Sequence, residues 1–436
     1  MLTNVRRAAC LAALLLLCAA AAVAQGAFGS LTGTVRDPAG AILAGASVEA
    51  TNKATGDKRS AVTNEEGVYT ITNLPVGTYT LTVTSAGFAP GKAEDVNVSV
   101  SFTTTLDVSL SPAGAAESVT VVGADTATSL NTTDQQLSTL ISNKKILDLP
   151  LLSRDPNALV LLAPGVAGSS STLGGFVVNG QRERNNNFLV DGIDNNDADV
   201  PGIPGGISTP NIDATQEFRV ITNNFNAEFG RNTGAIINVA TRGGSNEFHG
   251  GGYIYYRSDR FAARNFFDTS GHADPLQRRQ YGGSIGGPIK KDRTFFFFNF
   301  ERDDFDQGIQ VTQTVPTASA RQGIFNLSAL GLGTADIRGG NNALGAPVNQ
   351  NFAQLLSQLY PLPNTNGDGP LPGVFEFYRF STQTNDLSKQ LSARVDHRLS
   401  DRHNLSGSFA FNDGTFEFCC ESFPGANDAI QSPQRS

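Results

Sequence analysis

Regular alternation of apolar and polar positions is clearest near the end of the chain, over residues 390–412. In the first half of this stretch the apolar row is Leu391, Ala393, Val395 and Leu399, and the polar row is Gln390, Ser392, Arg394, Asp396 and Arg398. A short polar turn at 400–403 precedes a second run with the same alternation. Strands of about ten residues with one apolar and one polar face, joined by a tight turn, are typical of outer-membrane barrel hairpins. His397, on the apolar row, is expected near the membrane interface.

The phenylalanine-rich run at 294–302 gives a second such strand. Its side chains divide into a row expected to face lipid, Phe296, Phe298 and Phe300, and a row expected to face the barrel interior, Phe295, Phe297, Asn299 and Glu301. The segments 248–257 and 278–290 predict two more strands. The expected connections are long at 258–277, short at 290–293, very long at 304–384 and short at 400–403. This alternation fits extracellular loops and periplasmic turns.

Residues 25–112 predict a small β-sandwich. Short alternating runs are separated by turns at 37–40, 64–67 and 75–77, all rich in Gly, Pro, Asn or Asp. Short strands with turn signals at this spacing are typical of a sandwich.

Residues 125–246 predict a mixed α+β domain. Helical stretches are interrupted by Pro150, Pro156 and Pro164. Four short strands follow, at 176–179, 187–193, 217–222 and 235–241. Because the linkers between these strands are long and polar, we expect a weak independent core.

The first 24 residues predict export. Arg6 and Arg7 precede an apolar run, and Ala22 and Ala24 form a small-x-small cleavage site before Gln25. This is the pattern of a secretory signal peptide. A lipoprotein signal at Cys18 fits less well, since Leu17 stands where a small residue is expected. No later run has the 18 consecutive apolar residues of a membrane helix, so the exported chain is periplasmic, secreted or an outer-membrane barrel.

Charge and cysteine content narrow the possible partners. The chain has 436 residues, of which 17% are charged, and a net charge of −8, which gives a nucleic-acid partner no electrostatic support. After removal of the signal peptide only Cys419 and Cys420 remain. Neighbouring strand residues point to opposite faces, so a bridge between these two would be strained, and their state stays open.

Three motifs with a chemical meaning lack the context that they need. No histidine begins a zinc-binding H-x-x-E or H-E-x-x-H pattern. The aspartates at 191, 194, 197 and 199 miss the calcium-loop spacing and predict a solvated, hydrogen-bonded turn instead. Residues 282–286 fit G-x-S-x-G but lack the strand before and helix after that a nucleophile elbow needs. We therefore expect no metal, no cofactor, no catalytic residue and no enzyme activity.

The runs GTVRDPAGAILAGASVEATN and TNEEGVYTITNLPVGTYTLTVTSAGF resemble the carboxypeptidase regulatory-like domain. The resemblance covers about 85 residues and implies a carbohydrate-binding-like fold, without peptidase activity. Whether the domain binds sugar or acts only as a spacer stays open, because a fold does not define a function.

Three runs of the middle region resemble the plug of TonB-dependent outer-membrane receptors, in the Oar-like branch: LDLPLLSRDPNALVLLAPGV, VNGQRERNNNFLVDGIDNND and FRVITNNFNAEFGRNTGAIINVATRGGSNEFHG. The run YGGSIGGPIKKDRTFFFF resembles the first barrel hairpin of the same branch. The resemblance implies a mainly β chain: signal peptide 1–24, sandwich 25–112, linker 113–124, plug 125–246 and the N-terminal part of a barrel 247–436. Because barrels of this family close with 22 strands and five are predicted here, we expect a fragment.

Residues 117–122 lie where receptors with an N-terminal extension carry the TonB box. They are Glu117, Ser118, Val119, Thr120, Val121 and Val122. A TonB box needs only an extended segment that can add a strand to the sheet edge of a partner. We therefore expect this segment to contact the periplasmic domain of TonB; the alternative is a strand of the sandwich or of the plug.

The resemblance implies a function for the intact protein. It would lie in the outer membrane, in contact with lipid, with its N-terminal domain in the periplasm. It would import a small ligand, an oligosaccharide or a metal complex, with energy delivered through TonB. The alternative, from another functional class, is a surface adhesin built on the same scaffold.

Overall fold

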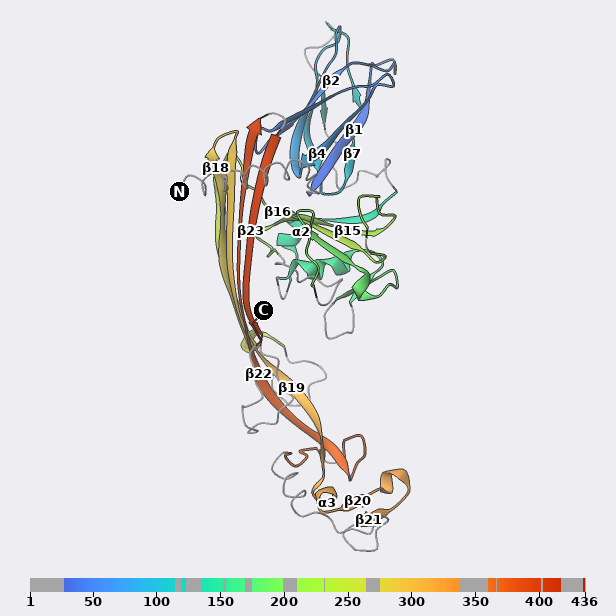
Figure 1. Ribbon diagram of the computed structural model, residues 1–436, viewed down its shortest axis with the longest axis vertical. Coiled ribbons are helices and arrows are strands. Elements are labelled where there is room, and N and C mark those ends of the chain that lie inside the picture. The colour runs from blue at the N-terminus through green and yellow to red at the C-terminus, as the bar shows by residue number, and fades with distance from the viewer. Residues whose placement is uncertain are drawn as a thin grey trace, which may run out of the picture. The chain divides into compact units, whose positions relative to one another are not determined.

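The computed structural model describes residues 27–113, 119–122, 135–151, 154–168, 175–198, 210–230, 232–263, 275–336, 360–365, 367–400, 403–416 and 434–435 (Figure 1). The chain divides into two compact units. The first comprises Met1–Gly252, Gly283–Phe300 and Gln390–Asn412, and the second comprises Tyr253–Gly282, Glu301–Lys389 and Asp413–Ser436.

The N-terminal domain is the expected β-sandwich. One sheet has the order β4-β1-β7, with β8 also paired to β1, and the other has the order β3-β2-β5-β6-β9. The strands are β1 (Phe28–Arg36), β2 (Ser47–Asn52), β3 (Lys58–Val62), β4 (Val68–Pro75), β5 (Gly77–Thr84), β6 (Gly91–Val98), β7 (Thr103–Thr105), β8 (Val108–Ser109) and β9 (Val119–Val122).

Alternation along the strands builds the core of the sandwich. Every second residue of β1 is buried, and Leu31 and Val35 are fully inaccessible. Tyr69 is buried in the same cluster and donates its hydroxyl to the carbonyl of Leu106 at 2.7 Å. Each fully buried Leu or Val side chain contributes about 1.5–3 kcal/mol, so this core can hold the domain together.

The central domain contains a five-stranded sheet of order β10-β15-β16-β13-β14. Its strands are β10 (Leu137–Ser142), β13 (Asn187–Val190), β14 (Ile193–Asp194), β15 (Thr215–Asn223) and β16 (Ile236–Thr241). Helix α2 (Asn143–Asp148), the 3-10 helices η1 (Pro156–Leu162) and η2 (Glu183–Asn185), and a small sheet of β11 (Val166–Gly168) and β12 (Phe176–Val178) complete it.

The core of this plug-like domain is better packed than the sequence predicts. β15 and β16 are buried along most of their length, on both faces. Phe218 and Val220 pack on one face, in a cluster with Ile146 and Leu159. On the other face Glu217 and Arg219 are buried against the sandwich domain, at Val100. A neighbouring domain supplies this second cover, which the pattern of the plug-like segment alone does not reveal.

The C-terminal half forms a sheet of long antiparallel strands in the order β17-β18-β19-β22-β23-β24. The strands are β17 (His249–Ser258), β18 (Leu276–Lys290), β19 (Thr294–Pro316), β22 (Phe375–Ser400), β23 (His403–Phe416) and the two-residue β24 (Gln434–Arg435). The expected rows of the phenylalanine-rich strand are confirmed: Phe295 and Phe297 are buried, whereas Phe298 is 38% exposed.

The long connection expected at 304–384 is shorter than the sequence predicts. β19 continues to Pro316 and β22 begins at Phe375, so the strands have 23 and 26 residues. The added part of β19 continues the alternation, with Phe305, Val311 and Val315 on one row and Asp304, Asp306, Thr312 and Thr314 on the other. Its β-branched residues also favour an extended backbone.

Short elements occupy the remaining described parts. They are η3 (Asp259–Phe261), α3 (Ala318–Arg321), β20 (Ile324–Asn326), η4 (Ser328–Leu330) and β21 (Thr334–Asp336). Within the described ranges, no helix has both the length and the apolar character needed to cross a membrane.

Candidate functional site

A charged cluster joins the polar row of β22 to the plug-like domain. The guanidinium of Arg394 lies 3.4 Å from Oδ2 of Asp191 and donates to Oγ1 of Thr241 at 3.1 Å. It also binds Asp396 on its own strand at 3.0 Å. Arg394 belongs to the polar row predicted for this strand, and through Arg394 this row contacts the plug-like domain.

The backbone holds Asp191 in place for this contact. Asp191 and Gly192 form the two-residue turn between β13 and β14, with positive φ values of 50° and 82°. Such φ values are those of a type I′ hairpin turn, in which Asp and Gly are favoured. The Asp191 carboxylate accepts from the amide of Thr241 at 2.9 Å and from its hydroxyl at 2.5 Å. The turn is thereby fixed to the end of β16.

Among the other aspartates of this region, Asp194 lies in a polar turn. Asp194 accepts a hydrogen bond from the amide of Asn196 at 2.9 Å, as in a polar turn. Across the described ranges, which exclude Asp199, no group of three or more His, Cys, Asp or Glu side chains is arranged to hold a metal ion.

A buried pair of amides forms a second contact. Asn211 Nδ2 donates to Asn299 Oδ1 at 2.7 Å, and Asn299 is only 1% exposed. Asn211 is fixed in turn by the amide of Ala214, which donates to its side chain. A buried amide is costly unless it is hydrogen-bonded, so Asn299 pairs specifically with the plug-like domain.

A third contact lies at the turn between β18 and β19. Asn246 Nδ2 donates to Asp292 Oδ1 at 2.8 Å, and the amide of Asp292 donates to Asn246 Oδ1 at 2.8 Å. This reciprocal pair ties the end of the central segment to the turn.

Two charged residues of β15 contact the sandwich domain. Glu217 accepts from the amide of Val100 at 2.6 Å, and Arg219 Nε donates to the carbonyl of Val100 at 2.7 Å. Burial raises the pKa of Glu217 to about 7, although the Val100 amide and the nearby Arg219 act in the opposite direction.

The raised pKa of Glu217 predicts a pH-dependent stability. The carboxyl ionises near its ordinary pKa of 4.5 in the unfolded chain but only near 7 in the folded chain. Folding therefore binds a proton between these values, and this group makes the chain less stable as pH rises through that window. We expect unfolding free energy to fall by about 2 kcal/mol from pH 5 to pH 7.5 through this group.

Urea unfolding of the wild type and of Glu217→Gln at both pH values measures this effect. Glutamine keeps an acceptor oxygen for Val100 but does not titrate. The difference between the two pH values should shrink in the variant. An unchanged difference would assign the pH dependence to other groups.

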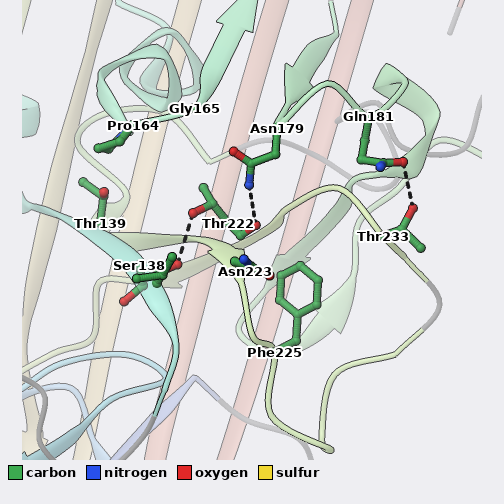
Figure 2. A pocket seen from close by; sticks show the side chains of 11 residues that line it. Ser138, Thr139, Pro164, Gly165, Asn179, Gln181, Thr222, Asn223, Phe225 and Thr233 are labelled. Carbon is green, nitrogen blue, oxygen red and sulfur yellow. Dashed lines mark hydrogen bonds between the residues drawn. The ribbon is translucent and has the colours of Figure 1, made fainter.

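The plug-like domain also has a cavity of about 560 Å³ (Figure 2). It is lined by Leu137, Ser138, Thr139, Pro164, Gly165, Asn179, Gln181, Thr222, Asn223, Phe225 and Thr233. Hydrogen bonds join several of these residues, including Asn179 Nδ2 to the carbonyl of Thr222 at 2.9 Å and Thr233 Oγ1 to Gln181 at 3.4 Å. Amides, hydroxyls and one aromatic ring without a charged lining residue suit a neutral, hydrogen-bonding ligand.

The expected TonB-contact segment is partly described. Val119–Val122 is an extended strand, β9, and it pairs in parallel with Gly91–Glu94 of β6. The segment thus has a partner inside the chain, which agrees with the alternative that it is a strand of the sandwich. Glu117 and Ser118 lie outside the described residues, so only four of the six positions have a known place.

Other predicted positions also lie outside the described residues. They are the signal-cleavage residues Ala22, Ala24 and Gln25, and the cysteines Cys419 and Cys420.

Sequence reasoning missed Glu217, Arg219 and the pairing of Asn299 with Asn211. A usable signal existed for the first two. Two opposite charges stand two positions apart in the run EFRVI, which is otherwise strand-forming. Residues so spaced share one face of a strand, which therefore had to be covered by polar partners or exposed to water.

Comparisons with known proteins agree with this architecture. Residues 30–111 match the carboxypeptidase regulatory-like domain, and residues 240–433 match the outer membrane beta barrel domain. The TonB-dependent transporter Oar of Myxococcus xanthus is 31% identical over 302 residues, covering 65% of this chain and 27% of that protein. The chain thus spans about a quarter of the relative's length.

Solved structures of one transporter and two receptors show partial likeness to this chain. The transporter YddB of Escherichia coli is 12% identical, with 64% of this chain and 33% of that chain covered and a TM-score of 0.39. A mutant of the ferric enterobactin receptor PfeA of Pseudomonas aeruginosa is 14% identical, with 66% and 34% covered and a TM-score of 0.39. The siderophore receptor PirA of Acinetobacter baumannii is 13% identical, with 68% and 51% covered and a TM-score of 0.32.

The match to the outer membrane beta barrel domain and the similarity to Oar both indicate the outer membrane as the location. The chain therefore resembles the TonB-dependent transporter Oar over 65% of its length, and it carries a carboxypeptidase regulatory-like domain and outer membrane β-barrel strands.

Proposed function

We propose that the intact protein imports a small ligand across the outer membrane, driven by TonB. The contact of Arg394 with Asp191 and Thr241 is the observation that supports this most directly. It ties a polar-row residue of a long strand to a domain that resembles a plug. A plug held to the wall by hydrogen bonds and one ion pair closes the pore, yet can be displaced by an applied force.

The segment 117–122 is the proposed point of TonB contact. β9 is the last described strand in its sheet, so the edge opposite β6 has no described strand on it. A sheet edge presents unpaired N–H and C=O groups, to which a partner strand can add. TonB can add to that edge, or it can take β9 from β6, to which only four residue pairs join it.

The proposed ligand is an oligosaccharide or a metal complex. The cavity of the plug-like domain favours the first, because its lining offers amides and hydroxyls such as Asn223 and Thr139, and the ring of Phe225. Sugars are commonly bound by such groups, whereas an anionic metal complex would require cationic side chains.

Val121→Pro tests the TonB contact. Proline has no N–H donor and cannot continue a strand ladder, so the full chain should lose most of its binding to the purified periplasmic domain of TonB. Val121→Thr keeps a β-branched residue and a backbone donor, and should bind as the wild type does. A pull-down in which the proline variant retains wild-type binding would remove segment 117–122 from the proposal.

Surface adhesion is the competing function, and the length of β19 and β22 favours it. With 23 and 26 residues, these strands exceed the roughly 9–11 that cross a bilayer. Growth on candidate nutrients, with and without the full-length gene and in a TonB-deletion strain, separates the two. Import requires both genes for growth, whereas adhesion leaves growth unchanged and reduces surface attachment when the receptor gene is lost.

A further inference from the structure

The loop that follows β6 is held at Val100 through its backbone. Val100 is completely buried, and both of its backbone polar groups are bound by charged side chains of β15. Its N–H donates to Glu217 and its C=O accepts from Arg219. Glu217 and Arg219 are 8% and 4% exposed. A hydrogen bond to the charged guanidinium of Arg219 is stronger than a neutral one, and both bonds are shielded from water.

The same patch makes two further contacts with this loop. Asn238 of β16 is paired with Arg219 across the strands, and its Nδ2 donates to Ser101 Oγ at 2.9 Å. The guanidinium of Arg219 lies 4.4 Å from the ring centre of Phe102, within the range of a cation–π contact. Glu217, Arg219 and Asn238 thus form a polar surface on the two central strands of the plug-like sheet. We call it the docking patch.

The sandwich presents the loop in a fixed shape. Ser101 has a positive φ of 51°, and its amide donates to the carbonyl of Phe28 at 2.9 Å. The carbonyl of Phe102 accepts from the amide of Ser30 at 2.9 Å. Because β1 holds the loop on both sides of this turn, little conformational entropy is lost when it docks.

We propose that the docking patch is a peptide-binding site whose ligand is loop 99–102 of the same chain, and that it makes the sandwich and the plug-like domain move as one body. β6 ends at Val98, two residues before Val100, and β9 pairs with its other end. A pull on Val119–Val122 is then transmitted through β6 and the loop to β15, in addition to the covalent linker. That TonB exerts this pull depends on the TonB contact proposed above, whereas the docking does not depend on it.

Amide hydrogen exchange of the full-length protein tests the docking. In the wild type the Val100 amide should be protected to the same degree as β15. Glu217→Ala removes its acceptor and should accelerate its exchange by about tenfold or more. Glu217→Gln keeps an acceptor oxygen and should change the rate by less than about threefold. Ser101→Ala leaves β15 unchanged but removes the acceptor of Asn238, so it should give a smaller acceleration. Acceleration in this variant would arise without any change in β15.

Two results would overturn the docking: fast exchange of the Val100 amide in the wild type, or no acceleration in Glu217→Ala. The TonB pull-down keeps the two proposals apart, because Glu217→Ala should bind TonB normally while its exchange changes.

Single-molecule pulling from a handle at residue 121 tests the route of the force. The wild type should open β15 in its first event, and Glu217→Ala should first release the linker; identical traces would refute the route.

Discussion

Gly33→Ala is expected to destabilise the sandwich domain by about 4 kcal/mol or more, enough to unfold it. A Cβ at this position of β1 would lie 1.9 Å from the carbonyl oxygen of Leu106 and 3.1 Å from Cε1 of Tyr69. The obstacle is a backbone carbonyl, which is itself held by the Tyr69 hydroxyl at 2.7 Å. Neither group can move aside without disrupting the core, so the added methyl group alone is sufficient to destabilise the domain.

Resistance of the folded chain to protease, followed through urea unfolding, measures this effect. Gly251→Ala is the matched control, because it makes the same change in a strand where nothing lies within 4 Å of the added atom. The control should stay within about 0.5 kcal/mol of the wild type. Equal midpoints for both variants would mean that β1 and the segment around Leu106 are not so closely packed.

Side-chain alternation predicts most of the fold. It predicts the sandwich at residues 25–112, and it separates Phe295 and Phe297 from Phe298 correctly. These assignments succeed because each depends on a local property, the two-residue repeat of a strand with one covered face. The strands predicted at 176–179, 217–222 and 235–241 are found for the same reason, within about two residues of their observed ends. The strand predicted at 187–193 is divided by the turn at Asp191 and Gly192 into β13 and β14, and β10 was not predicted.

Contacts between distant segments cannot be read from the pattern. Arg394 is assigned to the correct face, but no local feature pairs it with Asp191, 203 positions away, or with Thr241, 153 positions away. Likewise, Glu217 and Arg219 look like ordinary surface charges until Val100, 117 and 119 positions away, covers them. Such pairs depend on the topology of the folded chain, which cannot be inferred from the local pattern of a single sequence.

For segment 117–122 the sequence predicts a strand but not which sheet edge the strand pairs with. Its strand propensity is visible, but a strand of a few residues fits any open sheet edge equally well. Backbone pairing depends little on side chains, so composition cannot choose between β6 and a partner protein. Its pairing with β6 and the proposed contact with TonB are therefore compatible as two states of one strand.

Asp191→Ala is expected to loosen the plug-like domain from the long strands, at a cost of about 3–4 kcal/mol. Alanine is strained at the positive φ of 50° that this turn requires. The amide and hydroxyl of Thr241 lose their shared acceptor, and the guanidinium of Arg394 loses a partner while still buried for about three quarters of its surface.

Asp191→Asn distinguishes the effect of the negative charge from the effect of the turn conformation. Asparagine tolerates a positive φ and can still accept from the Thr241 amide, so it should cost only about 1 kcal/mol. Hydrogen exchange of the Thr241 amide in the full-length protein reports both variants. A double-mutant cycle of Asp191→Asn with Arg394→Gln should give a coupling of about 1–2 kcal/mol. If the two changes prove additive, Arg394 does not hold the plug-like domain, and the contact that best supports a closed pore loses its energetic basis.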